Sequence, residues 1–231
     1  MPRLRILSAG AAQAVTEQLI DAFRRDTGHE VTAEFSAVGA MKARVMAGEP
    51  VDVITLTQAM IEELIAAGFV AAGSRFDLGK VGTGVAVRAG APAPRIAGSD
   101  ELRATVLAAT KIVFPDPAVA TAGKVVIAAL EKLGVADEVR GRMQLFPNGY
   151  AAMKWLSADG GPRDIGITQD TEILPNKGVT YVGPLPDAFQ MKTVYSTGIA
   201  SRAQEPQLAR DFVERFKNAR ERLVAAGYEL L

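Results

Sequence analysis

The first 70 residues alternate short apolar runs with longer stretches in which apolar residues recur every three or four positions. Short apolar runs are typical of buried strands, and the longer period is typical of amphipathic helices. The pattern predicts strands and helices in turn: Leu4–Leu7, Ala12–Asp26, Val31–Phe35, Ala40–Ala47, Val51–Leu56 and Gln58–Ala67. Gly28, Gly48 and Gly68 each follow a predicted helix, where a left-handed cap is expected. Three successive strand–helix units indicate a parallel sheet.

A second block of strands and helices begins near Val81, with an alternating strand around Val85 and Val87. Its pattern predicts further elements at Asp100–Ala109, Lys111–Phe114, Lys124–Leu133, Met143–Phe146, Tyr150–Ser157, Asp164–Thr168, Gly178–Val182, Thr193–Ala200 and Pro206–Ala226. We therefore expect an α/β protein of two lobes, residues 1–81 plus 194–231 and residues 82–193, with parallel-rich sheets flanked by helices. In such folds ligands bind at the carboxyl ends of strands, here in a cleft between the lobes.

Composition excludes several classes of function. The 26 basic and 26 acidic residues balance, so nothing indicates a nucleic-acid partner. No apolar run approaches the roughly 18 residues of a membrane span. The chain has no cysteine, and its one histidine, His29, lies in a turn between a helix and a strand, so thiolate, zinc–thiolate and Ser/His/Asp chemistry are excluded. We expect a monomer with no cofactor, no metal and no membrane insertion.

Small residues stand where the first strands end and the next helices begin. Such turns leave backbone N–H groups open, and the helix dipole favours a negative charge there. This construction predicts a site for a small anionic ligand. The candidate ligand-binding residues all lie at strand ends or helix starts: Ser8, Gly10, Ala11, Val38, Gly39, Thr57, Thr121, Ala122, Gly149, Tyr150 and Gln169.

The segments SAGAAQAVTEQLIDAFRRDTGHEV, FSAVGAMKARVMAGEPVDVITLT, FPDPAVATAGKVV and DIGIT resemble the molybdate-binding proteins of ABC importers. The resemblance implies the type II periplasmic-binding-protein fold, with two hinged lobes. Where that family binds its oxyanion with two serines and a tyrosine, this chain has Ala11, Val38 and Gln169. Ala122 matches a backbone donor of the family, and Gly149 lies near another. Losing three donors costs about 1–3 kcal/mol each, which favours an organic carboxylate over molybdate.

A narrower resemblance covers GSRFDLGKVGTGVAVRAGAPAP, DIGITQDTEILP and GVTYVGPLPDAFQMKTVYSTGI, which look like the subgroup that includes bacterial aconitate isomerase. It implies a di- or tricarboxylate ligand. Four functions stay open: a carboxylate-binding protein, a cofactor-independent isomerase of an unsaturated di- or tricarboxylate, a molybdate or tungstate receptor of an ABC importer, and a cytosolic ligand sensor that contacts another protein. For an isomerase the proton-transfer group stays open among Asp116, Tyr150, Lys124, Lys42 and a bound water.

The start of the chain bears on its location in the cell. No apolar signal segment precedes the first strand, so the chain as given is expected to be cytoplasmic, or periplasmic with an ABC permease as partner if a signal has been removed.

Two basic residues are further candidates for the ligand site. Lys42 and Arg75 are each consistent with binding a ligand carboxylate or with an ordinary ion pair on the surface.

Overall fold

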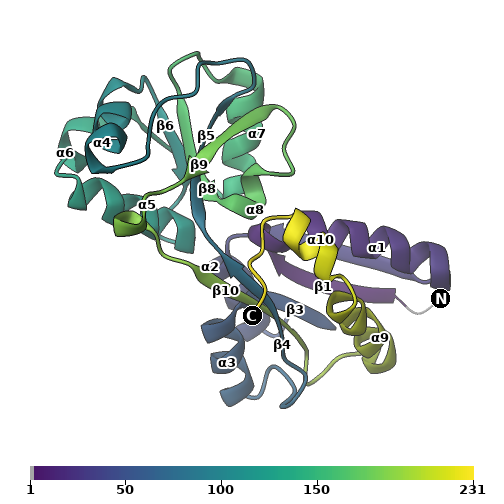
Figure 1. Cartoon of the computed structure of the whole chain (residues 1–231). Helices are drawn as coiled ribbons and strands as arrows, with labels where there is room; N and C mark the ends of the chain where they lie inside the picture. The colour runs from purple at the N-terminus through teal and green to yellow at the C-terminus, as the bar shows by residue number, and fades with distance from the viewer. Residues whose placement is uncertain (1–2) are drawn as a thin grey trace. The chain divides into compact units, whose positions relative to one another are not determined.

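The computed structural model describes residues 3–231, which form two compact units, each a five-stranded sheet with helices packed on it (Figure 1). The first unit combines the segment that ends at Val81 with Thr193–Leu231. The second unit is Gly82–Lys192. Sequence analysis assigns residue 193 to the second lobe, whereas here it opens a strand of the first unit.

The first unit contains both ends of the chain. Its elements are β1 (Arg3–Ala9), η1 (Gly10–Ala12), α1 (Gln13–Thr27), β2 (Glu30–Ser36), α2 (Val38–Met46), β3 (Val53–Thr57), α3 (Gln58–Ala66), β4 (Phe76–Val81), β10 (Thr193–Ile199), α9 (Pro206–Lys217) and α10 (Arg220–Ala225). The strand order is β2-β1-β3-β10-β4. The first three strands are parallel, and β10 runs antiparallel to both of its neighbours.

The second unit repeats this plan. Its elements are β5 (Thr83–Arg88), α4 (Ser99–Ala108), β6 (Ile112–Pro115), α5 (Thr121–Lys132), α6 (Ala136–Val139), η2 (Arg140–Arg142), β7 (Met143–Phe146), α7 (Gly149–Asp159), β8 (Ile165–Gln169), α8 (Asp170–Ile173), β9 (Val179–Pro184) and η3 (Asp187–Phe189). The strand order is β7-β6-β8-β5-β9. Strands β7, β6 and β8 are parallel, and β5 is antiparallel to β8 and β9.

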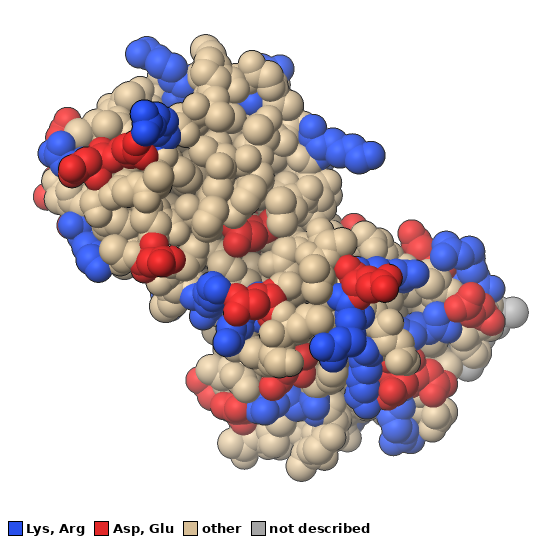
Figure 2. Space-filling view, viewed as in Figure 1, with Lys and Arg blue, Asp and Glu red and all other residues tan. Residues whose placement is uncertain are grey.

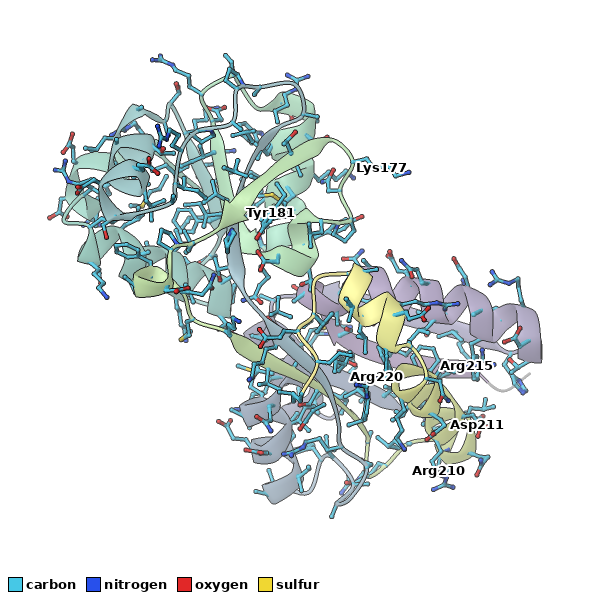
Figure 3. All side chains as sticks on the ribbon, viewed as in Figure 1. Lys177, Tyr181, Arg210, Asp211, Arg215 and Arg220 are labelled. Carbon is cyan, nitrogen blue, oxygen red and sulfur yellow. The ribbon has the colours of Figure 1, made fainter. Side chains whose placement is uncertain are left out.

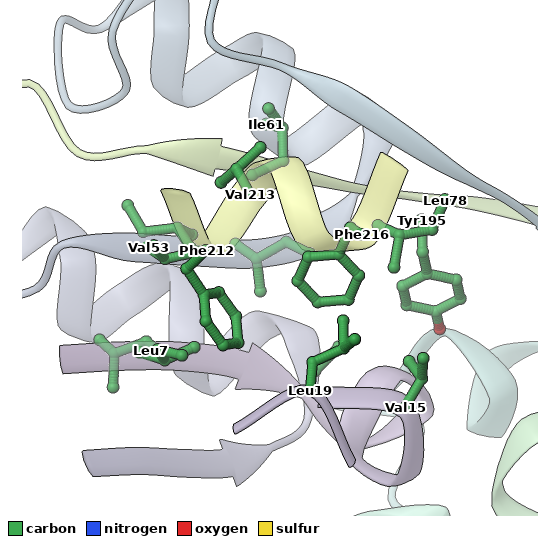
Figure 4. Close-up of a cluster of buried hydrophobic side chains, with 14 of the residues drawn as sticks. Leu7, Val15, Leu19, Val53, Ile61, Leu78, Tyr195, Phe212, Val213 and Phe216 are labelled. Atoms are coloured by element: carbon green, nitrogen blue, oxygen red, sulfur yellow. The ribbon is translucent and has the colours of Figure 1, made fainter. Parts of the chain in front are cut away.

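Each unit has its own apolar core. In the first, side chains of α1 and α9, such as Leu19 and Phe216, meet those of the sheet (Figure 4). Phe23 packs edge-on against Phe212 with ring centroids 5.5 Å apart. In the second, α5 covers one face of the sheet and α7 the other. On the visible face of the first unit acidic and basic side chains intermingle, so no single-sign patch forms there (Figure 2).

Several elements differ from the sequence prediction. The single helix predicted over Pro206–Ala226 is wrong, because Asn218 donates its side-chain amide to the Glu214 carbonyl at 3.1 Å and ends α9, after which α10 starts afresh. Strand β4 was not predicted, since Gly79 and Lys80 break its apolar alternation. A Cβ at Gly79 would lie 2.6 Å from the Glu229 carbonyl oxygen of the C-terminal segment. Helices α2 and α5 begin two and three residues earlier than predicted.

Candidate functional site

In the first unit, six of the predicted residues gather at one edge of the sheet. The parallel strands β1, β2 and β3 all end there, and η1, α2 and α3 begin directly after them. The residues so placed are Ser8, Gly10, Ala11, Val38, Gly39 and Thr57. Ser8 is fully buried, and its hydroxyl donates to the Ala9 carbonyl at 3.2 Å, so the loop is held from within.

The N-termini of η1 and α2 have no side-chain cap. Alanine occupies both N-cap positions, Ala9 and Ala37, and neither first turn contains an acidic residue. In α2 the first N–H to donate to a helix carbonyl is that of Met41, which donates to Ala37 at 3.1 Å. The preceding N–H groups, including those of Val38 and Gly39, are therefore the orphan donors of this helix. They form a surface suited to an anion.

Two threonine hydroxyls at this edge are already engaged within the unit. Thr57 caps α3 by accepting a hydrogen bond from the Met60 N–H at 3.4 Å. Thr55 donates to Thr197 at 3.0 Å. The two basic candidates are also paired, Lys42 with Glu63 and Arg75 with Glu62 and Asp77. The open donors at the starts of η1 and α2 therefore include their backbone N–H groups.

In the second unit, α5 begins with open donors like those of α2. Its N-cap is Ala120, no side chain caps it, and its first turn contains Thr121 and the buried Ala122 but no acid. Gly123 packs against the end of β6, where a Cβ would overlap the Pro115 carbonyl oxygen. Asp116 accepts a hydrogen bond from the Ala118 N–H at 2.8 Å, which gives it a turn role.

Helix α7 begins at the same sheet edge, but its donors are used inside the protein. Asn148 caps it by accepting from the Ala151 N–H at 2.8 Å. The backbone N–H groups of Gly149 and Tyr150 stabilise the charged form of the Glu172 carboxylate. Sequence analysis offers both residues to an external ligand, whereas here their N–H groups face this internal carboxylate.

Glu172 is only 4% exposed and receives a hydrogen bond from the Thr168 hydroxyl at 2.5 Å. Burial raises the pKa of Glu172 to about 7, because desolvation of the charged form outweighs the stabilising hydrogen bonds from Thr168 and the backbone. Glu172 was not among the sequence candidates. Its only signal is a glutamate directly before the apolar pair Ile173–Leu174, which alone does not distinguish a buried acid from an exposed one.

Gln169 ends β8 and is the most unusual of the predicted residues. The side chain is 1% exposed, and neither its amide nitrogen nor its oxygen has a hydrogen-bond partner among the described residues. An unsatisfied buried polar group costs about 1–3 kcal/mol. By contrast, the buried Asp52 of the first unit accepts hydrogen bonds from the backbone of Arg5, Gln204 and Glu205. Gln169 is therefore a site where a ligand group is expected.

Asp170, the next residue, is a second acid that sequence analysis missed. Its carboxylate lies against Gly82 and Gly84 and hydrogen-bonds Tyr181. Tyr181 belongs to β9 of the second unit (Figure 3). Burial raises the pKa of Asp170 to about 6, against the opposing effects of the Tyr181 hydrogen bond and the Lys192 charge. Burial, together with the Asp170 charge, raises the pKa of Tyr181 well above its usual value. An acid with a pKa near neutrality is suited to proton transfer.

Residues 3–231 contain neither a metal-binding cluster of side chains nor a helix fit to span a membrane. No group of three or more His, Cys, Asp or Glu side chains is arranged to hold a metal ion in this part of the chain. None of its helices combines the length and apolar composition that a membrane span requires.

Known proteins resemble this chain in sequence and in fold. Aconitate isomerase from Pseudomonas sp. is 28% identical over 223 residues, which is 91% of this chain and 80% of that protein. The periplasmic molybdate-binding protein of Azotobacter vinelandii has a TM-score of 0.81 at 24% identity, covering 99% of both chains. L-Phospholactate-bound PEB3 of Campylobacter jejuni has a TM-score of 0.70 at 15% identity, covering 99% of this chain and 100% of the other.

These structures share the two-lobed α/β fold of periplasmic binding proteins, as the sequence predicts. The family model described as bacterial extracellular solute-binding protein matches residues 4–229, nearly the whole chain. The chain belongs to the bacterial extracellular solute-binding protein family.

Proposed function

We propose that the chain binds a small organic anion, a carboxylate, through open helix N-termini and buried polar side chains. The observation that carries the proposal is the unpartnered amide of Gln169, at the sheet edge where α5 begins without a cap. The open N–H groups of η1 and α2 in the first unit provide donors of the same kind.

Two arguments favour a carboxylate over molybdate or tungstate. The first is the chemistry of the donors: Ala11 and Val38 contribute only backbone N–H groups, and Gln169 contributes an amide in place of a phenol. The second is internal. At the N-terminus of α7 the chain already holds one carboxylate, that of Glu172, against backbone N–H groups. An aconitate isomerase relative and a fold neighbour bound to L-phospholactate are consistent with a carboxylate ligand.

A thermal-shift panel tests the proposal. The purified chain is heated with molybdate, tungstate, sulfate, phosphate, citrate, cis- and trans-aconitate and smaller carboxylates. A ligand at 100 times its Kd adds about 2.7 kcal/mol of stability, or roughly 5–10 °C for a chain of this size. A shift with carboxylates alone supports the proposal. A shift with molybdate or tungstate alone would overturn it and restore the oxyanion receptor, for which an ABC permease is the expected partner.

A second candidate is an isomerase of an unsaturated di- or tricarboxylate, and two observations favour it. One is the aconitate isomerase relative, which matches 91% of this chain. The other is Asp170, whose pKa of about 6 suits a group that removes and returns a proton. Migration of a double bond needs one proton removed from carbon and one added elsewhere, with no net oxidation.

Incubation with cis-aconitate, followed by separation of the trans isomer, tests this candidate. In the isomerase case Asp170→Asn lowers kcat at least 100-fold. Asp137→Asn is the matched control, since the Asp137 side chain is exposed and pairs with Arg140 on the surface. Its kcat stays within about twofold of the wild-type value. Absence of conversion at micromolar protein would leave binding as the function.

A further inference from the structure

We infer that the ligand carries a hydroxyl group beside its carboxylate, so that hydroxycarboxylates bind more tightly than the same acids without the hydroxyl. The inference rests on the proposed carboxylate-binding function and adds the class of carboxylate. Its basis is the pair formed by Thr83 and Gln169, the first residue of β5 and the last of β8.

The two side chains lie on one face of the second sheet. Thr83 and Gln169 are direct partners in the antiparallel pairing of β5 with β8, so their side chains point to the same side. The residues two and four positions away from this pair on each strand belong to the core cluster that α5 covers. They are Val85 and Val87 after Thr83 on β5, and Ile167 and Ile165 before Gln169 on β8. Thr83 and Gln169 therefore continue the α5-covered face to the sheet edge where α5 begins.

The backbone around this pair is satisfied, but the side chains are not. Gln190 accepts a hydrogen bond from the Thr83 N–H at 2.8 Å and donates to the Thr83 carbonyl at 3.0 Å, which fixes the strand end. Thr83 is fully buried and Gln169 is 1% exposed. Thr83 Oγ1, Gln169 Oε1 and Gln169 Nε2 nevertheless have no hydrogen-bond partner among the described residues.

The chemistry of these three atoms selects the ligand. The Gln169 amide has one donor group and one acceptor, and exchanging its oxygen and nitrogen does not change that inventory. A carboxylate or a deprotonated oxyanion brings only acceptors, which satisfy the amide N–H, the Thr83 hydroxyl and the α5 N–H groups. The amide oxygen needs a donor. A ligand hydroxyl supplies that donor, and its own oxygen accepts a hydrogen bond in return.

Isothermal titration of the full chain with matched acids tests this inference. The pairs are citrate with propane-1,2,3-tricarboxylate, and malate with succinate, which differ only in the hydroxyl. We expect the hydroxylated member to bind at least tenfold more tightly. Gln169→Met keeps the volume and removes both polar atoms, so the preference falls to about twofold or less. Gln144→Met, the same change on strand β7, keeps the full preference, and Thr83→Val provides a second variant of conserved shape, with a partial loss.

The outcomes separate the inference from the proposed function. Equal affinity of the wild-type chain for both members of each pair overturns the inference and leaves carboxylate binding in place. A preference that survives in Gln169→Met also overturns it, since another group then recognises the hydroxyl. Failure of all four acids to bind, while aconitate or a smaller carboxylate still shifts the melting temperature, also overturns the inference. Failure of every carboxylate in the thermal-shift panel overturns the proposed function itself.

Discussion

Helices α5 and α7 follow neighbouring parallel strands of the second unit, and their N-termini are completed in opposite ways. At α7, Asn148 caps one N–H group and the Glu172 carboxylate faces others. At α5, Ala120 provides no cap and no internal acid lies in the first turn. The same strand–helix arrangement therefore binds a carboxylate of the chain itself at the N-terminus of α7, whereas the N–H groups at the N-terminus of α5 have no such acceptor.

The difference between the two N-termini shows that a site kept open for a ligand lowers the stability of the ligand-free protein. A completed N-terminus such as that of α7 stabilises the folded state, since caps contribute about 0.5–2 kcal/mol. An N-terminus without a cap lacks that contribution to stability until a ligand supplies the missing acceptor. The unpartnered Gln169 amide at the same sheet edge lowers the stability of the ligand-free protein further. Functional sites are commonly less stable than their surroundings for this reason.

The largest expected effect comes from disturbing the completed helix. A Cβ at Gly149 would overlap the Glu172 carboxylate and the Thr168 hydroxyl. We therefore expect Gly149→Ala to lower the free energy of unfolding by about 3 kcal/mol or more. Gly141→Ala is the control, because nothing lies within 4 Å of a Cβ there. Urea unfolding measures both, and a loss below 1 kcal/mol for Gly149→Ala would show that Glu172 does not need this close approach.

The next effect is a pH dependence that comes from Glu172. Its folded pKa, about 7, lies above the ordinary value of 4.5, so folding favours the protonated form. The associated stability is complete below pH 4.5 and is lost as the pH rises through 7, a fall of roughly 3 kcal/mol.

The glutamine side chain of Glu172→Gln does not titrate, so the unfolding free energy of this variant does not fall between pH 4.5 and 7 on account of residue 172. Asp170, whose pKa is also raised, contributes a smaller slope of the same sign at lower pH in both proteins. Urea unfolding at pH 4.5, 6 and 7.5 provides the comparison. Parallel profiles for the two proteins would assign the slope to other groups.

A third prediction concerns Gln169, at the sheet edge where α5 begins. Gln169→Met removes an unsatisfied amide and keeps the side-chain volume, so the ligand-free protein gains about 1–2 kcal/mol while citrate binding weakens. Thermal unfolding without ligand measures the gain. A loss of stability instead would mean that the Gln169 amide is satisfied within the protein.

Most of the fold followed from periodicity. The alternation of apolar runs and amphipathic stretches located the strands other than β4 and the helices of nine or more residues, because burial imposes periods that survive in a single sequence. The short helices α6, α8 and α10 were not predicted as separate elements. The failures have local causes. Strand β4 has a glycine at φ 143° in its middle, and the break before α10 depends on a side-chain bond of Asn218 that periodicity does not report.

The candidate site was predictable only in part. Small residues at helix starts were visible in the sequence, since an alanine or glycine in place of a cap is a local signal. Whether an N–H group is open depends on distant residues: Gly149 and Tyr150 look like Ala122 in sequence, yet Glu172 faces them. Thr83 and Asp170 were missed because their importance comes from burial and cross-strand pairing, which no single-residue pattern shows.

The smallest effect is the sharpest test of the comparison, since it makes α5 resemble α7. Ala120 has the extended backbone of an N-cap residue, so Ala120→Ser places a hydroxyl where it accepts from the Ala122 or Gly123 N–H. We expect about 1 kcal/mol of added stability and weaker citrate binding, because one donor is taken. Asn148→Ala does the reverse at α7, losing about 1 kcal/mol with citrate affinity unchanged. Unfolding and titration of both variants decide the matter: if Ala120→Ser is stabilised at full affinity, the ligand does not bind at the α5 N-terminus.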